Sequence, residues 1–125
     1  MADVKIRLDQ SALRRLDRAA VTALEQTAEA IHTDLMQSRT MPFRSGNLQN
    51  ESTFVDTSEF ARGHVELVSA TPYARRLYYH PEYHFSAEEN PDAGAGWFEP
   101  YTAEGEKRDF AEKAFRRLYR KGAGV

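Results

Sequence analysis

The sequence contains no cysteine among its 125 residues. This absence excludes disulfide frameworks, thiolate zinc sites and cysteine nucleophiles together. A chain of this length has to rely on an apolar core, and it is long enough to bury roughly two thirds of the surface that its unfolded form exposes. We therefore expect a single domain, residues 1–125, that folds without covalent cross-links.

Long apolar runs are also missing. No window approaches the roughly 18–20 apolar residues of a membrane span. The N-terminal stretch MADVKIRLDQ carries charges where a secretion signal needs an apolar segment. These features predict a protein that is made and kept in the cytosol and has no membrane partner.

An excess of positive charge is missing as well, because 17 basic and 19 acidic residues give a net charge of −2. Tight nucleic-acid binders usually carry a net basic charge or a basic stripe. The one locally basic stretch, Arg116 to Lys121, follows acidic residues between Glu104 and Glu112. Acids early and bases late suit the dipole of a single helix.

Apolar residues at steps of three and four are the clearest positive signal. They predict an amphipathic helix over about residues 11–37, roughly 40 Å long, which Asp9 or Ser11 can cap. A second stripe predicts a C-terminal helix over about residues 105–121, with Gly122 as its stop. The stripe of the first helix consists of Leu13, Leu16, Ala20, Leu24, Thr27, Ile31 and Leu35.

Alternating apolar and polar residues predict the sheet. Residues 4–8 form a short strand or an extended lead-in, and residues 48–69 form an antiparallel hairpin with a loop of about six residues. Its strands lie at about 48–57 and 64–69. Thr71-Pro72 then ends the second strand and can start a helical turn from Tyr73 to Tyr78.

An aromatic-rich segment follows at about residues 79–101. Its aromatic side chains flank a polar tip, residues 86–96, which predicts an exposed loop between extended arms. We expect Tyr73 to Tyr83 to pack near the sheet, and Phe85 to Trp97 to reach a neighbouring subunit. The complete pattern predicts an α+β fold in which a long N-terminal helix and a C-terminal helix pack on a small antiparallel sheet, with an extended aromatic arm.

Motifs for catalysis are weak in this sequence. The run His80-Pro81-Glu82-Tyr83-His84 differs from H-E-x-x-H, because Pro81 follows the first histidine and disfavours a helix there. No nucleophile elbow, phosphate-binding loop or dinucleotide fingerprint occurs. We expect no catalytic, metal or cofactor-binding residues. Two alternatives stay open: a metal enzyme built on His80 and His84, and a nucleic-acid-binding module that uses an arginine–tyrosine cluster and the basic C-terminus.

The run TPYARRLYYHP at 71–81, continued by FS at 85–86, NP at 90–91, Ala93 and GWF at 96–98, resembles the signature of phage minor capsid proteins. The run FRSGNL at 43–48 resembles an element of the wider tail-completion, or head–tail joining, family. In that family a long helix precedes this element, and a sheet and an x-P-Y-A turn follow it, in the order predicted here. The wider family often follows Tyr-Ala with an acidic residue and a Gly-Thr pair. Arg75 to Pro81 departs from this and favours the minor capsid branch.

This resemblance implies a structural virion protein of a tailed bacteriophage or prophage, assembled in the cytoplasm of the bacterial host. It implies a homo-oligomeric ring, a hexamer or dodecamer, in the neck of the virion, around a channel through which DNA passes without specific binding. In isolation the chain is expected to be a monomer or to self-associate weakly. The implied neighbours are a head-closure or adaptor protein and a tail terminator or tail tube protein, with no cofactor.

A ring requires two different patches that meet around a closed axis. We expect the aromatic segment to supply one of them. The candidate interface residues are Tyr73, Arg75, Arg76, Tyr79, His80, Tyr83, Phe85, Trp97 and Phe98.

Overall fold

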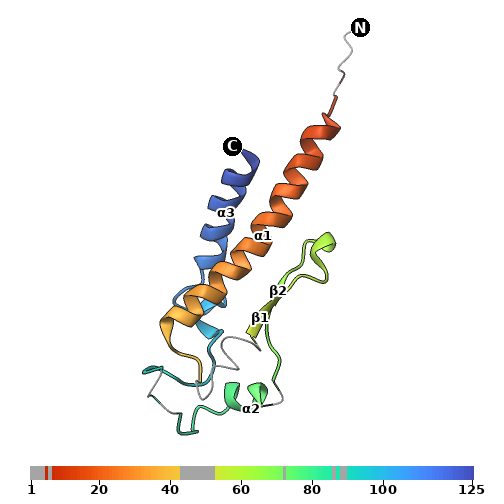
Figure 1. The fold of residues 1–125 in the computed structure, drawn as a ribbon. Helices are drawn as coiled ribbons and strands as arrows, with labels where there is room; N and C mark the ends of the chain where they lie inside the picture. Colours follow the sequence, from red (N-terminus) through yellow and green to blue (C-terminus); the bar gives the residue numbers. More distant parts are fainter. Residues whose placement is uncertain (1–4, 6, 43–52, 72, 86, 88–89) are drawn as a thin grey trace.

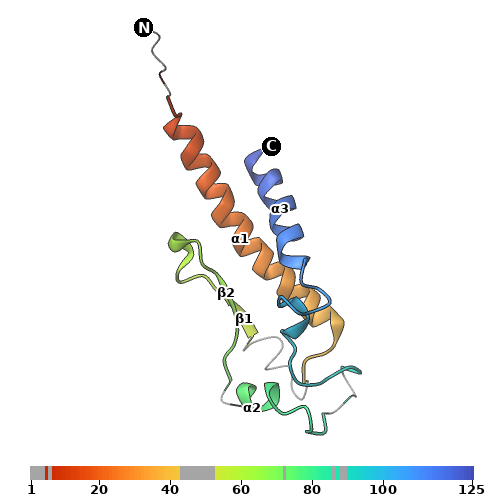
Figure 2. The same ribbon diagram turned by 180° about the vertical axis from the view of Figure 1, so that it is seen from behind.

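The computed structural model describes residues 5, 7–42, 53–71, 73–85, 87 and 90–125 of the chain. Two long helices and a hairpin dominate it: Figure 1 shows α1 lying between α3 and the strands β1 and β2, and Figure 2 shows the same order from behind. The predicted α+β fold is confirmed. In chain order the elements are α1 (Gln10–Ser38), β1 (Thr53–Asp56), η2 (Phe60–Arg62), β2 (Glu66–Ser69), α2 (Ala74–Tyr78), η3 (Glu99–Tyr101) and α3 (Phe110–Ala123).

Helix α1 begins where the sequence predicts. Asp9 caps it, because its carboxylate accepts hydrogen bonds from the backbone N–H groups of Ser11 and Ala12 at 3.0 and 3.2 Å. The helix ends at Ser38, where Arg39 adopts a left-handed conformation with a φ of 57°. No helix in the described part of the chain has both the length and the apolar character to cross a lipid bilayer.

Small residues on α1 let α3 approach closely. The buried positions of α1 are Ala19, Ala23, Thr27, Ala28 and Leu35. A Cβ atom placed on Gly122 of α3 would lie 3.8 Å from the Cβ of Ala19, an ordinary van der Waals contact. The two helices lie side by side and run antiparallel (Figure 1).

Helix α3 differs from the prediction at both ends. It begins at Phe110 instead of about 105, because residues 102–109 form turns, with the backbone N–H of Gly105 bonded to the carbonyl of Thr102. The predicted stop at Gly122 is wrong, since that residue lies inside the helix. The C-cap is Gly124, whose φ of 74° favours glycine.

The hairpin has the predicted antiparallel pairing, with a register from Thr53↔Ser69 to Asp56↔Glu66. Its connection, residues 57–65, contains η2 and is longer than the six residues predicted. The other predictions for this sheet lie mostly outside the described residues, which omit 1–4, 6 and 43–52. They include the FRSGNL run and the first half of the predicted strand 48–57, while Leu8 is exposed and outside any strand.

The core lies at the C-terminal end of α1. Leu35, Met41, Ala74 and Trp97 form one buried cluster, which joins α1, the segment after it, α2 and the aromatic segment. The indole N–H of Trp97 donates a hydrogen bond to the Ser69 hydroxyl at 3.2 Å, and this hydroxyl lies 2.8 Å from that of Thr53. Trp97 thereby connects the hairpin to α1 and α2.

The prediction that Trp97 reaches a neighbouring subunit is wrong, because this side chain is only 2% exposed. The segment before it folds back on its own chain: the backbone N–H of Gly94 bonds to the Thr40 carbonyl at 3.0 Å, and the buried Asn90 amide donates to the Met41 carbonyl at 2.7 Å. A large indole whose N–H group has a hydrogen-bond partner stabilises the fold more when it is buried in the core than when it is exposed on an arm. Of the predicted tip, Pro91 and Asp92 are exposed.

We expect Trp97→Ala to lower the free energy of unfolding by about 3–5 kcal/mol, because it leaves a cavity and removes the hydrogen bond from the indole to Ser69. Urea unfolding followed by far-ultraviolet circular dichroism measures this loss. Tyr79→Ala is the matched control, because Tyr79 is 66% exposed, and it should cost less than about 1 kcal/mol. Equal losses in the two variants would contradict the place of Trp97 in the core.

Candidate interaction surface

The nine candidate interface residues separate by exposure. Trp97 is buried, and His80, Phe85 and Phe98 are half-buried. The side chains open to solvent are Tyr73, Arg75, Arg76, Tyr79 and Tyr83, which lie on α2 or next to it. This reverses the predicted division of the aromatic segment, since the exposed tyrosines belong to the half that was expected to pack near the sheet.

Helix α2 has one buried and one exposed face. Ala74 belongs to the core, and the Tyr78 ring meets Trp97 edge to face with 4.9 Å between the ring centroids. On the other face, Arg75 and Arg76 extend into solvent. Tyr79 contacts Tyr78 edge to face at 5.0 Å but stays largely exposed. The consecutive arginines and the exposed tyrosine are residue types that are enriched as anchors in protein interfaces.

His80 interacts with its own loop. Its ring stacks on Tyr83 at 4.6 Å, and its Nδ1 lies 2.6 Å from the Glu82 carboxylate. This hydrogen bond from His80 holds the pKa of Glu82 below its usual value. Within the ranges that the structure describes, there is no group of three or more histidine, aspartate or glutamate side chains that could hold a metal ion. The metal hypothesis gains no support from this region.

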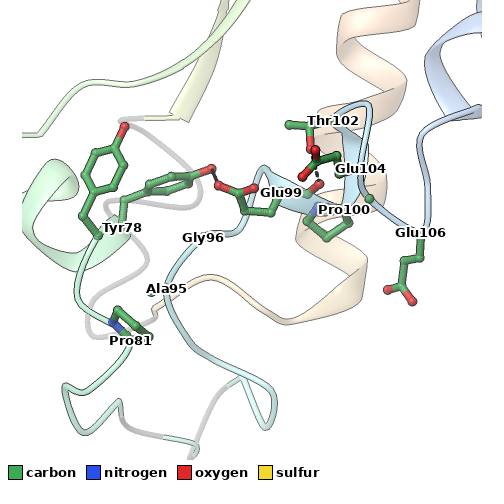
Figure 3. Close-up of a pocket in the computed structure, with 11 residues that line it drawn as sticks. Tyr78, Pro81, Ala95, Gly96, Glu99, Pro100, Thr102, Glu104 and Glu106 are labelled. Carbon is green, nitrogen blue, oxygen red and sulfur yellow. Dashed lines mark hydrogen bonds between the residues drawn. The ribbon is translucent and has the colours of Figure 1, made fainter.

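An open groove of about 780 Å³ lies between α2 and the segment that precedes α3 (Figure 3). Tyr78, Tyr79 and Pro81 form one side of it, and residues 99–106 form much of the other. Three carboxylates line this groove, from Glu99, Glu104 and Glu106, and no basic side chain is among its described lining residues. We call this site the acidic groove.

The wall of the acidic groove is tightly built. The backbone N–H of Lys107 bonds to the Pro100 carbonyl at 2.7 Å. A Cβ atom on Gly105 would lie 2.2 Å from that carbonyl oxygen, so the turn requires glycine. The acids of this groove are not among the residues predicted from the sequence, although the run EPYTAEGE at 99–106, with three acids, a proline and a glycine, is a visible signal.

Tyr78 connects the two sides of the groove. Its hydroxyl donates to the Glu99 carboxylate at 3.3 Å. Burial and the nearby Glu99 carboxylate raise the pKa of Tyr78 to about 12, so the phenol stays protonated at neutral pH. This pair therefore positions Glu99. Glu104 and Glu106 are exposed and have no ion-pair partner in the described part of the chain.

A polar network next to the groove connects its wall to α1. The Asp34 carboxylate accepts hydrogen bonds from the Tyr101 hydroxyl at 2.6 Å and the Lys107 ammonium at 2.7 Å. The ammonium also lies 5.5 Å from the centroid of the Tyr101 ring. Burial alone would raise the pKa of Asp34, but the bonds from Lys107 and Tyr101 lower it below its usual value. Burial and Asp34 in turn raise the pKa of Tyr101.

A second, smaller recess of about 250 Å³ lies at the end of the hairpin. Asp56 and Glu66 face each other across the strands, and His64 lies 2.8 Å from the Glu66 carboxylate. The hydrogen bond to Glu66 raises the pKa of His64. A protonated His64 offsets the repulsion of the paired acids, which gives this group a local structural role.

Comparisons with known proteins identify no relative of this chain. No family model matches the chain, and neither the curated proteins nor the solved structures contain a match.

We expect Asp34→Asn to lower the free energy of unfolding by about 1–2 kcal/mol at neutral pH, because it removes the charge that Lys107 and Tyr101 bind. Since the folded-state pKa of Asp34 is lowered, its contribution is complete above the unfolded pKa of about 3.9 and is lost as pH falls through the folded value. Chemical unfolding at several pH values measures this. A difference between wild type and variant that stays constant down to acid pH would contradict it.

Proposed function

We propose that this chain is a structural virion protein of a tailed bacteriophage or prophage, which acts in head–tail joining or tail completion. It is one subunit of a ring in the neck, around the DNA exit channel. It works through contacts with identical copies, and with a head-closure or adaptor protein and a tail terminator or tail tube protein. Its resemblance to phage minor capsid proteins over residues 71–98 supports this proposal.

The observation that carries the proposal is the set of large apolar side chains that the described part of the chain leaves exposed. These side chains are at least 39% exposed, among them Phe54, Phe60, Tyr73, Tyr79 and Tyr83. Exposed aromatic side chains of this kind favour protein–protein contact, and a subunit of an assembly gains the missing burial from its neighbours.

The hairpin supports the same proposal. Its sheet has only the two strands β1 and β2 within the described residues, so each strand has an outer edge without a strand partner there. A two-stranded hairpin is marginally stable alone, and a free edge can add a strand from another chain. Phe54, 43% exposed and paired with Val68, lies on the face opposite Thr53.

The charge balance suits a channel through which DNA slides. Each contact that neutralises a phosphate adds salt-dependent affinity and slows movement along the duplex. A net charge of −2 and an acidic groove make such contacts few. Passage of DNA without specific binding is consistent with this composition.

A second candidate function is nucleic-acid binding through α2. Arg75 and Arg76 are exposed beside the exposed Tyr79, an arrangement that can bind phosphates and stack on bases. A salt-dependent shift of DNA by micromolar protein would favour this function. The absence of a shift at low salt would remove it.

We expect a phage or prophage that lacks this chain to accumulate filled heads and free tails, which electron microscopy of lysates distinguishes from joined particles. Tyr79→Ser combined with Tyr83→Ser should reduce the yield of joined particles at least about tenfold if these exposed rings bind a neighbour. Arg62→Ser, at the exposed end of the hairpin, is the control and should join normally.

Particles of normal yield and infectivity in the absence of the chain would overturn the proposal. Empty heads without tails would move the role from joining to head closure. The tyrosine variant has to keep the wild-type unfolding curve, so that a loss of joining reports a lost contact.

A further inference from the structure

The acidic groove presents carboxylates that the chain itself does not neutralise. Residues 99–106 contain three acids and no base. The nearest following cation, Lys107, is engaged by Asp34 at 2.7 Å. Figure 3 shows Pro81 and Tyr78 on one side of the groove and Pro100 and Glu106 on the other, with Glu99 between them. Apolar walls with carboxylates suit a guanidinium or an ammonium group, which binds carboxylates through its charge and the faces of aromatic rings through cation–π contact.

Helix α3 presents the complementary charge. Residues 113–121 contain five bases and no acid. Lys113, Arg117 and Arg120 follow at steps of four and three, so they share one helix face, and all three are exposed. Arg116 pairs with Glu112 at 2.7 Å, whereas these three bases have no ion-pair partner in the part of the chain that the structure describes. We call this face the basic face of α3.

The basic face points away from α1. Ala114 is the buried residue of α3, and Phe115 and Tyr119 stack at 5.9 Å on a half-buried side of the helix. The helix starts close to the segment that contains η3, which forms one wall of the acidic groove, and leads away from it toward the C-terminus (Figure 1). Arg117 and Arg120 lie about 10 and 15 Å along the axis from Phe110, at a rise of 1.5 Å per residue. The two charged sites therefore lie apart on one molecule and are not joined by an ion pair in it.

We propose that the acidic groove of one copy binds the basic face of α3 of a second copy of the same chain. This inference rests on the ring assembly of the proposed function and names the surfaces that form its subunit interface. The contact is heterologous, because two different patches meet, so repetition of it generates a closed ring or a filament. Each copy offers one groove and one basic face, and the unpaired charges of both are neutralised in every contact.

The opposite charges also determine that a groove pairs with a basic face and not with another groove. A groove cannot bind another groove, since both are acidic, and two basic faces repel each other. Like-charge juxtaposition across an interface is costly and suppresses wrong pairings. The exposed Tyr79 at the groove adds an aromatic surface on which an arginine of the second copy can stack.

A charge-swap experiment with the full-length protein tests the proposal. Arg117→Glu with Arg120→Glu removes the basic face, and Glu104→Lys with Glu106→Lys reverses the groove. Each variant alone should self-associate at least about tenfold more weakly than wild type in sedimentation velocity at low salt. An equimolar mixture of the two variants should associate again, because each reversed site then meets its complement. The chain with all four substitutions should self-associate like wild type.

The matched control is Arg14→Glu with Arg15→Glu, which makes the same charge change on two exposed arginines of α1 that do not line the groove. It should leave self-association unchanged. Association of wild type should weaken as salt rises from about 50 mM to about 500 mM, since the contact is screened. Circular dichroism checks that each variant is folded. The milder pair Arg117→Gln with Arg120→Gln replaces an unfolded variant of the basic face, Glu104→Gln with Glu106→Gln replaces an unfolded variant of the groove, and each should also weaken association.

Three results would overturn the inference. The first is a mixture of the complementary variants that stays monomeric. The second is a wild-type chain that stays monomeric at the lowest salt and highest concentration. The third is a control variant that weakens association as much as the loss of the basic face. A different result separates the two proposals. If the mixture associates again but virions are normal in the absence of the chain, the proposed phage function is wrong and the proposed subunit interface is supported.

Discussion

The burial of Trp97 is the interaction on which most of this fold depends. Its ring packs with Leu35 and Met41 at the end of α1, and its N–H reaches Ser69 of β2. Helix α2 has only five residues and the sheet only two described strands, so neither is stable by itself. The indole supplies a surface common to all of them, and this makes them one unit.

The position of this core at one end of α1 has consequences for the surface. Around the core, the chain folds back on itself and forms the acidic groove and the exposed tyrosines. Toward the N-terminus of α1, buried alanines let α3 pack closely, and the outer face of α3 carries basic residues. The resulting molecule has different chemistry at its two ends, which is what a head-to-tail assembly needs.

The candidate site was only partly predictable from the sequence. The sequence predicts Tyr73, Tyr79, Tyr83 and the two arginines of α2 as interface candidates, and all five are exposed, although their run was expected to pack near the sheet. The sequence also predicts Trp97 for this surface, because a tryptophan beside glycines is typical of an exposed loop, and only its hydrogen-bond partner shows that it is buried. The acidic groove was not predicted, since its walls are brought together by bonds such as that from Gly96 to the Tyr78 carbonyl, which no periodicity reports.

The sequence by itself determined the elements whose cause is local. The three-and-four period and the Asp9 cap were sufficient for α1, and alternation was sufficient for the pairing of β1 with β2. Only the tertiary structure decided which aromatic side chains are buried, where α3 begins and where unpaired acids gather. The physical reason is that these outcomes depend on contacts between residues far apart in sequence: Trp97 with Ser69, and Tyr101 and Lys107 with Asp34.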